Sequence, residues 1–191
     1  IDTGIDYRHP DLAANIWRNT REIPGNGVDD DRNGFVDDVN GFDFANRDNN
    51  PWDDNGHGTH VAGTIGAVGN NNVGVAGINR NVKLMPLKSF GSNGSASLLN
   101  IVSAVNYATT MGAKIINASF GGGGYSQAMF DAVQRANRSG VLFVAAAGNN
   151  GRNTDFQPQF PAAYNLPNVI SVAATDRFDQ RANFSNYGRN T

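Results

Sequence analysis

The sequence contains no cysteine among its 191 residues. This absence excludes disulfide bonds, thiolate nucleophiles and cysteine-ligated metals, and it fits any redox compartment. Long apolar runs are missing as well. The longest, from Val141 to Ala147, has only the length of a strand, whereas a membrane helix needs about 20 apolar residues. We therefore expect a soluble protein with no membrane partner.

The chain also lacks an excess of positive charge, because 15 Lys and Arg residues stand against 17 Asp and Glu residues. The composition thus gives no sign of nucleic acid as a partner. With 39% hydrophobic residues and a formal net charge of −2, the chain does not have the composition of a disordered protein. Its length suits one compact domain.

Glutamate is almost absent, since Glu22 is the only one, and nine of the 16 aspartates lie between Asp29 and Asp54. Short carboxylates mixed with Gly and Asn favour tight loops and oxygen-liganded cations, whereas helix surfaces usually carry Glu. The 23 glycines add many sharp turns. This composition indicates a loop-rich molecule.

Both ends of the chain resemble interior sequence. The first four residues read as the end of a buried strand that enters a turn, and residues 184–191 read as a polar loop. There is no initiator Met and no signal peptide to interpret. We expect residues 1–191 to be part of a longer protein, truncated at both ends.

Strand and helix patterns alternate along the second half of the chain. The expected strands cover residues 82–88, 115–119, 141–147 and 169–174. Helices are expected over residues 97–111 and from a cap at Ser126 to Gly140. This alternation predicts an α/β fold with a parallel β-sheet and helices on both faces. Working residues then lie past the carboxyl ends of strands, and this places Asp2, Ser119 and Asn149 on one edge.

Two histidines lie in the segment from Gly56 to Thr64, which reads GHGTHVAGT. Its small residues predict a closely packed helix that leaves an imidazole accessible at its start. Two alternatives stay open. The histidines can be ordinary loop or core residues, or His57 and His60 can form a zinc pair, which needs a third protein ligand.

Three further motifs carry chemistry. Asp2-Thr3-Gly4 follows a strand, and its Asp can cap a turn or serve as a catalytic carboxylate. Residues 117–122 read NASFGG, and residues 144–149 read VAAAGN. The Ala and Gly residues make a groove wall without side-chain bulk. Asn149 then offers an amide donor for an oxyanion, or it simply belongs to a Gly-Asn turn.

Taken together and in this order, the four motifs resemble those of the subtilisin-like serine proteases, the subtilase or peptidase S8 family, over essentially the whole chain. The resemblance implies that Asp2 is the triad carboxylate, that His57 is the general base and that Asn149 is the oxyanion donor. The groove walls that it implies are Ser119, Phe120, Gly121, Ala146, Ala147 and Gly148. The implied strand that pairs with the substrate backbone is Ser95-Ala96-Ser97, with Gly94 and Leu98 beside it.

One family element is missing from the sequence. The family's nucleophile lies in a Gly-Thr-Ser-Met-Ala helix start, and no such string occurs here. We therefore interpret residues 1–191 as a partial subtilisin-like catalytic domain that is inactive alone, with the serine beyond Thr191. The implied parent is a secreted or cell-surface serine endopeptidase that favours apolar or aromatic side chains before the cut. Its partners would be protein or peptide substrates and its own propeptide. The alternative is a non-catalytic, calcium-stabilised binding or scaffold module of the same fold.

The aspartate-rich loop has the ligand spacing of an EF-hand-like calcium site, with Gly34 at its sixth position. The expected ligands are Asp29, Asp31, Asn33, the carbonyl of Phe35, and Asp37. Position 12 of the loop is Asn40 and not the usual bidentate Glu, so either Asp38 takes its place or the affinity is low. The alternative is a solvated acidic loop without an ion. A second calcium site is implied by the resemblance alone. Its ligands would be the side chains of Asp11 and Asn71 and the carbonyls of Gly69, Val73 and Val75.

Overall fold

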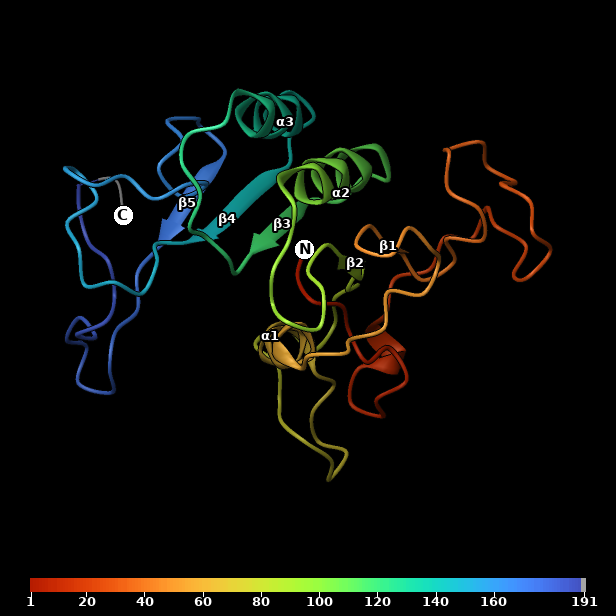
Figure 1. The fold of residues 1–191 in the computed structure, drawn as a ribbon. Coiled ribbons are helices and arrows are strands. Elements are labelled where there is room, and N and C mark those ends of the chain that lie inside the picture. The colour runs from red at the N-terminus through yellow and green to blue at the C-terminus, as the bar shows by residue number, and fades with distance from the viewer. Residues whose placement is uncertain (190–191) are drawn as a thin grey trace. The chain divides into compact units, whose positions relative to one another are not determined.

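The computed structural model describes residues 1–189, and the chain divides into two compact units, Ile1–Ala104 and Val105–Thr191. The boundary between them lies within the helix α2 (Leu98–Thr110). Figure 1 shows the elements in chain order. The single catalytic domain expected over residues 1–191 stays a prediction.

The first unit contains mostly loops and a few short elements. They are the 3-10 helix η1 (Ala13–Asn15), the strands β1 (Phe42–Asp43) and β2 (Leu87–Lys88), the helix α1 (His57–Gly66) and the start of α2. Strands β1 and β2 pair in parallel, and Asp2 forms a further parallel bridge with Lys88. Asp2 therefore lies at the end of a short extended segment beside β2, as the sequence predicts.

The strand expected over residues 82–88 is much shorter in the structure. Only Leu87–Lys88 forms regular pairing, while Leu84 makes an isolated parallel bridge with Ile16. Pro86 separates the two parts, because it has no N–H for a sheet ladder. Its carbonyl still accepts a hydrogen bond from the Phe42 N–H at 3.3 Å.

A small apolar core holds the first unit together. Its buried members come from the N-terminal loop, from α1 and from the segment before β2. They are Ile5, Leu12, Ile16, Ala62, Ala67 and Leu84, with Tyr7, Ile65 and Val82 packed against them. Helix α1 thus contributes one face to the core, and its first residue, His57, remains exposed.

The second unit is a parallel sheet with helices. Strands β3 (Ile115–Ala118), β4 (Leu142–Ala146) and β5 (Val169–Val172) pair in that order, and both pairings are parallel. The helix α3 (Gln127–Arg138) connects β3 to β4 and packs on β4 (Figure 1). The α/β fold with parallel strands, expected from the alternating pattern, is confirmed.

Helix α3 begins where the sequence predicts. The Ser126 side chain accepts a hydrogen bond from the Met129 N–H at 3.4 Å, so it satisfies one of the unpaired donors at the helix start. Buried residues recur at helical spacing on one face: Met129, Ala132, Val133 and Ala136. Arg135 and Arg138 lie in the last turn, where positive charge complements the helix dipole.

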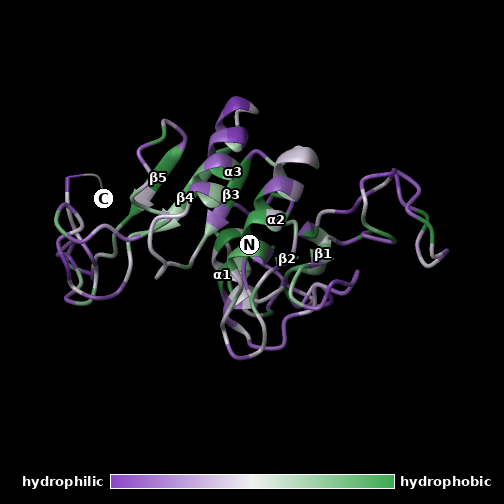
Figure 2. Ribbon diagram, turned by 45° about the horizontal axis from the view of Figure 1, so that its top comes forward, coloured by the Kyte–Doolittle hydropathy of each residue, from purple (hydrophilic) through white to green (hydrophobic). Residues whose placement is uncertain are grey.

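The two faces of the β3-β4-β5 sheet differ. Phe143 and Ala145 of β4 are buried, whereas Leu142 is 41% exposed. On the neighbouring strands Ile115 is 59% exposed and Val172 48%. These strands are nevertheless hydrophobic along most of their length (Figure 2). One face is therefore packed, and the other carries apolar side chains that the described residues cover only in part.

Among the described residues, no helix combines the length and the apolar character needed to cross a bilayer.

Candidate active site

The first unit brings Asp2 and His57 into direct contact. The Nδ1 atom of His57 lies 2.7 Å from the Asp2 Oδ1 atom. The Asp2 side chain is 13% exposed and that of His57 is 53% exposed. Because Nδ1 faces a carboxylate, the neutral ring carries its proton on Nδ1, and Nε2 is free to accept a proton.

The close approach of α1 to the Asp2 loop requires a glycine at position 58. A Cβ atom there would collide with the carbonyl oxygen of Gly4 and would lie 3.1 Å from the Asp2 Cβ atom. Since Gly58 has no side chain, the helix start packs directly on the loop that carries Asp2. This contact sets the separation of the two functional side chains.

Asp53 ties the Asp2 loop to the start of α1. Its Oδ1 atom accepts hydrogen bonds from the Thr3 hydroxyl at 2.8 Å and from the Gly56 N–H at 2.9 Å. Its Oδ2 atom accepts from both the N–H and the hydroxyl of Thr59. The Thr3 hydroxyl in turn accepts from the Gly58 N–H at 2.9 Å. One carboxylate therefore holds both segments that form the Asp2–His57 pair.

The ionised form of Asp53 is strongly favoured. Desolvation by burial raises the pKa of its carboxyl. The hydrogen bonds from the Gly56 N–H, the Thr59 hydroxyl and N–H and the Asn55 N–H outweigh this effect and lower the pKa from 3.8 to about 2. A negative charge just before a helix also complements the positive end of its dipole.

Lys88 is a second residue that connects the Asp2 loop to other segments of the first unit. Its side chain is completely buried, and its ammonium group donates to the carbonyls of Thr3 at 2.7 Å and Phe90 at 2.9 Å. The third partner is the Asp54 carboxylate. A buried ammonium needs such partners, because desolvation of an unpaired charge is costly. Lys88 thereby fixes the backbone directly after Asp2.

The sequence-based reasoning missed Asp53, Thr3 and Lys88. A signal existed for Asp53, since an Asp shortly before a predicted helix is a typical N-terminal capping residue. For Lys88 the only hint was its place within an apolar strand pattern. The role of Thr3 depends on contacts with residues 50 and 55 positions away, which a local sequence pattern does not reveal.

The histidine pair does not gather a metal-ligand set among residues 1–189. The only group of three or more acidic or histidine side chains with mutually close ligand atoms lies elsewhere in this described part. His60 is exposed, and its N–H belongs to the first turn of α1, donating to the Gly56 carbonyl at 3.1 Å. The zinc alternative therefore finds no third protein ligand in this part of the chain.

The segment expected to pair with a substrate backbone lies in an exposed loop before α2. The Gly91 N–H donates to the Ser95 carbonyl, and the Ser97 hydroxyl accepts from the Asn100 N–H at 3.2 Å. Leu98, beside this segment, is the first residue of α2. Ser97 caps the helix and ends the extended backbone there. Gly94 and Ala96 lie within the loop.

The second unit contains a cavity of about 280 Å³ at the carboxyl ends of its strands. Its lining residues are Asn117, Ser119, Val144, Ala145, Ala146, Ala147, Gly148, Asn149, Val172, Ala173, Ala174 and Ser185. The cavity thus includes Ser119, Asn149 and the Ala-Ala-Gly wall expected from the sequence. Phe120 and Gly121 are not among its lining residues. Asn149 is exposed just beyond β4.

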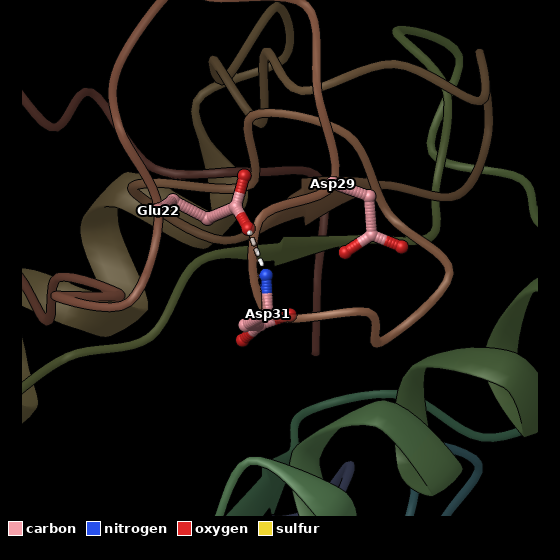
Figure 3. Close-up of side chains that lie close together, drawn as sticks. All are labelled: Glu22, Asp29 and Asp31. Carbon is pink, nitrogen blue, oxygen red and sulfur yellow. Dashed lines mark hydrogen bonds between the residues drawn. The ribbon is translucent and has the colours of Figure 1, made fainter.

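A cluster of carboxylates lies in the aspartate-rich loop of the first unit. Ligand oxygens of Glu22, Asp29 and Asp31 lie within 4.8 Å of one another (Figure 3). Glu22 is buried, and its Oε1 atom accepts from the Asp31 N–H at 3.1 Å. Glu22 was not expected as a ligand, although its being the only glutamate was a usable signal.

The other residues expected in this loop have different partners. The Asp37 carboxylate accepts from the Gly25 and Gly27 N–H groups, while the Asp37 N–H donates to the Glu22 Oε2 atom at 3.0 Å. Asp38 is fully buried and accepts from the side-chain amide of Asn33 at 2.8 Å. The Phe35 N–H donates to the Asn33 side-chain oxygen. The structure therefore brings the carboxylates of Asp29 and Asp31 together with that of Glu22, and the Asp37 carboxylate is not part of this group.

Asp11 lies against the loop of residues 69–75, as the resemblance implies. Its Oδ1 atom accepts from the Asn71 side-chain amide at 2.8 Å, and its Oδ2 atom accepts from the Val75 N–H at 2.9 Å. These two hydrogen bonds, the one from Val75 first, lower the pKa of the Asp11 carboxyl. The Asn71 side-chain oxygen accepts from the Val73 N–H. Gly69 begins this loop with a φ of 69°.

Comparison with known proteins gives consistent results. The model of the subtilase family matches residues 1–191. The thermophilic serine proteinase of Bacillus sp. (strain AK1) is 40% identical over 188 residues, which are 98% of this chain and 40% of that protein. The cell wall-associated protease of Bacillus subtilis (strain 168) is 43% identical over 189 residues, 99% of this chain and 18% of that protein.

A solved structure is similar as well. The crystal structure of a cold adapted subtilisin-like serine proteinase matches with a TM-score of 0.75 and 31% identity, covering 99% of this chain and 58% of that one. The chain therefore spans less than two thirds of the length of the relatives it matches. The family match over residues 1–191, the Asp2–His57 pair and the parallel α/β fold together show that this chain belongs to the subtilase family.

Proposed function

We propose that residues 1–191 form part of the catalytic domain of a serine endopeptidase. The observation that carries this proposal is the 2.7 Å contact between Asp2 Oδ1 and His57 Nδ1. With its Nδ1 proton held by the carboxylate, His57 can take a proton from a serine hydroxyl through Nε2 and later deliver it to the leaving amine. Asp2 stabilises the His57 imidazolium that exists between these two proton transfers. The serine would come from sequence beyond Thr191.

Asn149 and the cavity of the second unit supply the other functions expected of the site. The amide of Asn149 would donate a hydrogen bond to the oxyanion of the tetrahedral intermediate. The cavity would bind the substrate side chain that precedes the cleaved peptide bond. Its walls of Ala and Gly leave room for apolar or aromatic groups, so we propose broad specificity for such residues. Residues 94–98 would contact the substrate backbone.

We also propose that calcium binds at Glu22, Asp29 and Asp31. Three carboxylates with oxygens within 4.8 Å of one another suit a hard cation, and they would repel one another without positive charge. Arg21 offsets part of that repulsion through its ion pair with Asp31. The ion would supply structural stabilisation of the loop. A second site at Asp11 rests on the resemblance and on its contact with Asn71.

The setting we propose is extracellular or at the cell surface, with protein or peptide substrates and the protein's own propeptide as partners. A relative that is named as cell wall-associated supports this setting. The loop-rich chain without cysteines is also of the kind that calcium would stabilise.

The test is peptide hydrolysis by the complete parent protein. His57→Ala should abolish most of the activity, because it removes the general base. His60→Ala is the matched control, since His60 lies three residues further along the same helix and is exposed. Residues 1–191 expressed alone should show no labelling by a serine-reactive phosphonate.

Three outcomes would contradict the proposal. An inactive parent with intact calcium-dependent stability would favour the binding or scaffold module. Equal losses of activity in the two histidine variants, with zinc bound in stoichiometric amount, would favour a metal hydrolase. Stoichiometric phosphonate labelling of residues 1–191 alone would show that the nucleophile lies within this segment.

A further inference from the structure

Asn186 is a buried side chain whose hydrogen-bonding capacity is completely used. It is 1% exposed. Its Nδ2 group donates to the Ala147 carbonyl at 2.9 Å and to the Gln159 side-chain oxygen at 3.2 Å. Its Oδ1 atom accepts from the Asn150 N–H at 3.1 Å and from the Arg152 N–H at 3.0 Å. A side-chain amide can donate two hydrogen bonds and accept two, so none of its groups is left unsatisfied.

These hydrogen bonds lie on both sides of Asn149. The side chain bonds to the backbone before and after this residue, and the Asn186 N–H also donates to the Gly148 carbonyl at 2.9 Å. Gly148 has a φ of 104°, and a Cβ atom at this position would come within 2.5 Å of the Asn186 Nδ2 atom. The backbone that presents Asn149 is therefore packed directly against Asn186.

The segment from residue 147 to residue 152 contains neither helix nor strand, so no regular ladder fixes its backbone. Asn149 itself is exposed at the cavity. An oxyanion donor contributes to catalysis only when it is held close to the position of the developing charge. Backbone hydrogen bonds hold the ends of this loop, from the Ala147 N–H to the Val172 carbonyl and from the Gly151 N–H to the Phe184 carbonyl. The side chain of Asn186, 36 residues away from Asn150 in sequence, links the backbone on the two sides of Asn149.

We infer that Asn186 is a positioning residue for the oxyanion hole, which acts on the reaction through Asn149. This inference rests on the proposed function, because it needs Asn149 to be the oxyanion donor. Removal of the Asn186 amide leaves the Ala147 carbonyl and the N–H groups of Asn150 and Arg152 without these hydrogen bonds, and the backbone around Asn149 then relaxes toward other conformations. The amide of Asn149 loses its alignment while the cavity itself remains.

Asn168 offers a matched control in the same unit. It is also a buried amide, and its Nδ2 group donates to the carbonyls of Val133 at 3.3 Å and Val141 at 2.9 Å. These contacts link α3 to the start of β4, whereas Asn149 follows the end of β4. Loss of this amide should reduce stability without any effect on the orientation of Asn149.

The experiment compares four variants of the complete parent protease, with kcat and KM corrected by active-site titration and a melting curve for each. Asn149→Leu should lower kcat by on the order of 10²–10³, the range for loss of an oxyanion donor in enzymes of this family. Asn186→Ala should lower kcat by on the order of 10² with little change in KM. Asn168→Ala should lower the melting temperature and leave kcat nearly unchanged. In the double variant of Asn149 and Asn186, kcat should be no lower than in Asn149→Leu alone.

The outcomes separate the two proposals. If Asn149→Leu leaves kcat unchanged, the oxyanion role fails and the inference fails with it. If Asn149→Leu lowers kcat but Asn186→Ala does not, or if the two losses are additive, only the positioning role is overturned. Should Asn186→Ala fail to fold, Asn186→Ser decides, since its hydroxyl has a single O–H donor and cannot replace the four hydrogen bonds of the amide. A folded Asn186→Ser protein with full kcat overturns the inference.

Discussion

Thr3 illustrates how the residues around His57 depend on one another. Its backbone N–H donates to the Asp2 carboxylate at 2.7 Å, its hydroxyl donates to Asp53, and the same hydroxyl accepts from the Gly58 N–H. Thr3 thus contacts Asp2 through its backbone, and its side chain contacts both Asp53, which precedes α1, and the first turn of α1. A substitution at any of these positions would alter the alignment of the Asp2–His57 pair.

Asp53→Asn should lower the melting temperature of the parent protein at neutral pH, because the amide NH₂ group would face backbone N–H donors. The folded-state pKa of Asp53 is about 2, below its ordinary value of 3.8. Its stabilising contribution is therefore present above the unfolded-state value and is lost as the pH falls through the folded-state value. The difference in melting temperature between wild type and variant should narrow between about pH 4 and pH 2.

Melting curves across this pH range would test the prediction. Asp48→Asn is the control, since Asp48 is exposed and its carboxylate accepts from the Asn50 N–H two residues later. A constant difference between wild type and Asp53→Asn down to pH 2 would show that the ionised Asp53 carboxylate does not contribute as proposed.

At the scale of elements, the helix α3 and the strands of the second unit were predicted well. Their patterns are local, with apolar residues at helical spacing after Ser126 and short, mostly apolar runs in the strands. The segment before β2 was predicted less well. Its pairing depends on which distant segments lie beside it, and Pro86 divides that pairing into two parts.

Ser126→Ala should destabilise the second unit through its effect on α3. The serine side chain is the acceptor for the Met129 N–H, and loss of such a cap typically costs about 1 kcal/mol. Ser139→Ala at the other end of the helix is the matched control, because the cap hydrogen bonds there come from the backbone N–H. Urea unfolding would measure both variants. Equal destabilisation would contradict the capping role of Ser126.

The candidate site was predicted only in part from the sequence. Asp2, His57 and Asn149 lie in recognisable motifs, and the structure pairs the first two and places the third at a cavity. Residues that support them, such as Asp53 and Asn186, do so through contacts with distant backbone groups. A local sequence pattern carries no information on those contacts, because they form only when the loops are folded.

For the molecule as a whole, calcium should raise the stability of the parent protein. A ligand that binds only the folded state adds RT ln(1 + [L]/Kd), about 2.7 kcal/mol at roughly 100 times Kd. Asp29→Asn should remove most of this gain, because it takes one negative charge from the cluster with Glu22 and Asp31. In the presence of a chelator, the melting temperature of the same variant should be close to that of the wild type. Differential scanning calorimetry with calcium and with chelator would measure both effects.

The control for this experiment is again Asp48→Asn, which removes one aspartate charge outside the cluster. It should keep the full calcium-dependent gain. A loss of stability in Asp29→Asn that is the same with calcium and with chelator would refute a calcium site at this loop. The acidic loop would then be a solvated surface, the alternative left open by its sequence.

The pairing of Asp2 with His57 has a consequence for folding kinetics. The two residues are 55 positions apart, and Lys88, which fixes the backbone after Asp2, is 85 positions from Thr3. Contacts between such distant positions form late and slowly, since long loops must close before the contacts stabilise them. A newly synthesised or partly unfolded chain therefore has no aligned carboxylate and imidazole. We expect the Asp2 carboxylate and the His57 imidazole to become aligned only in the final, cooperative step of folding.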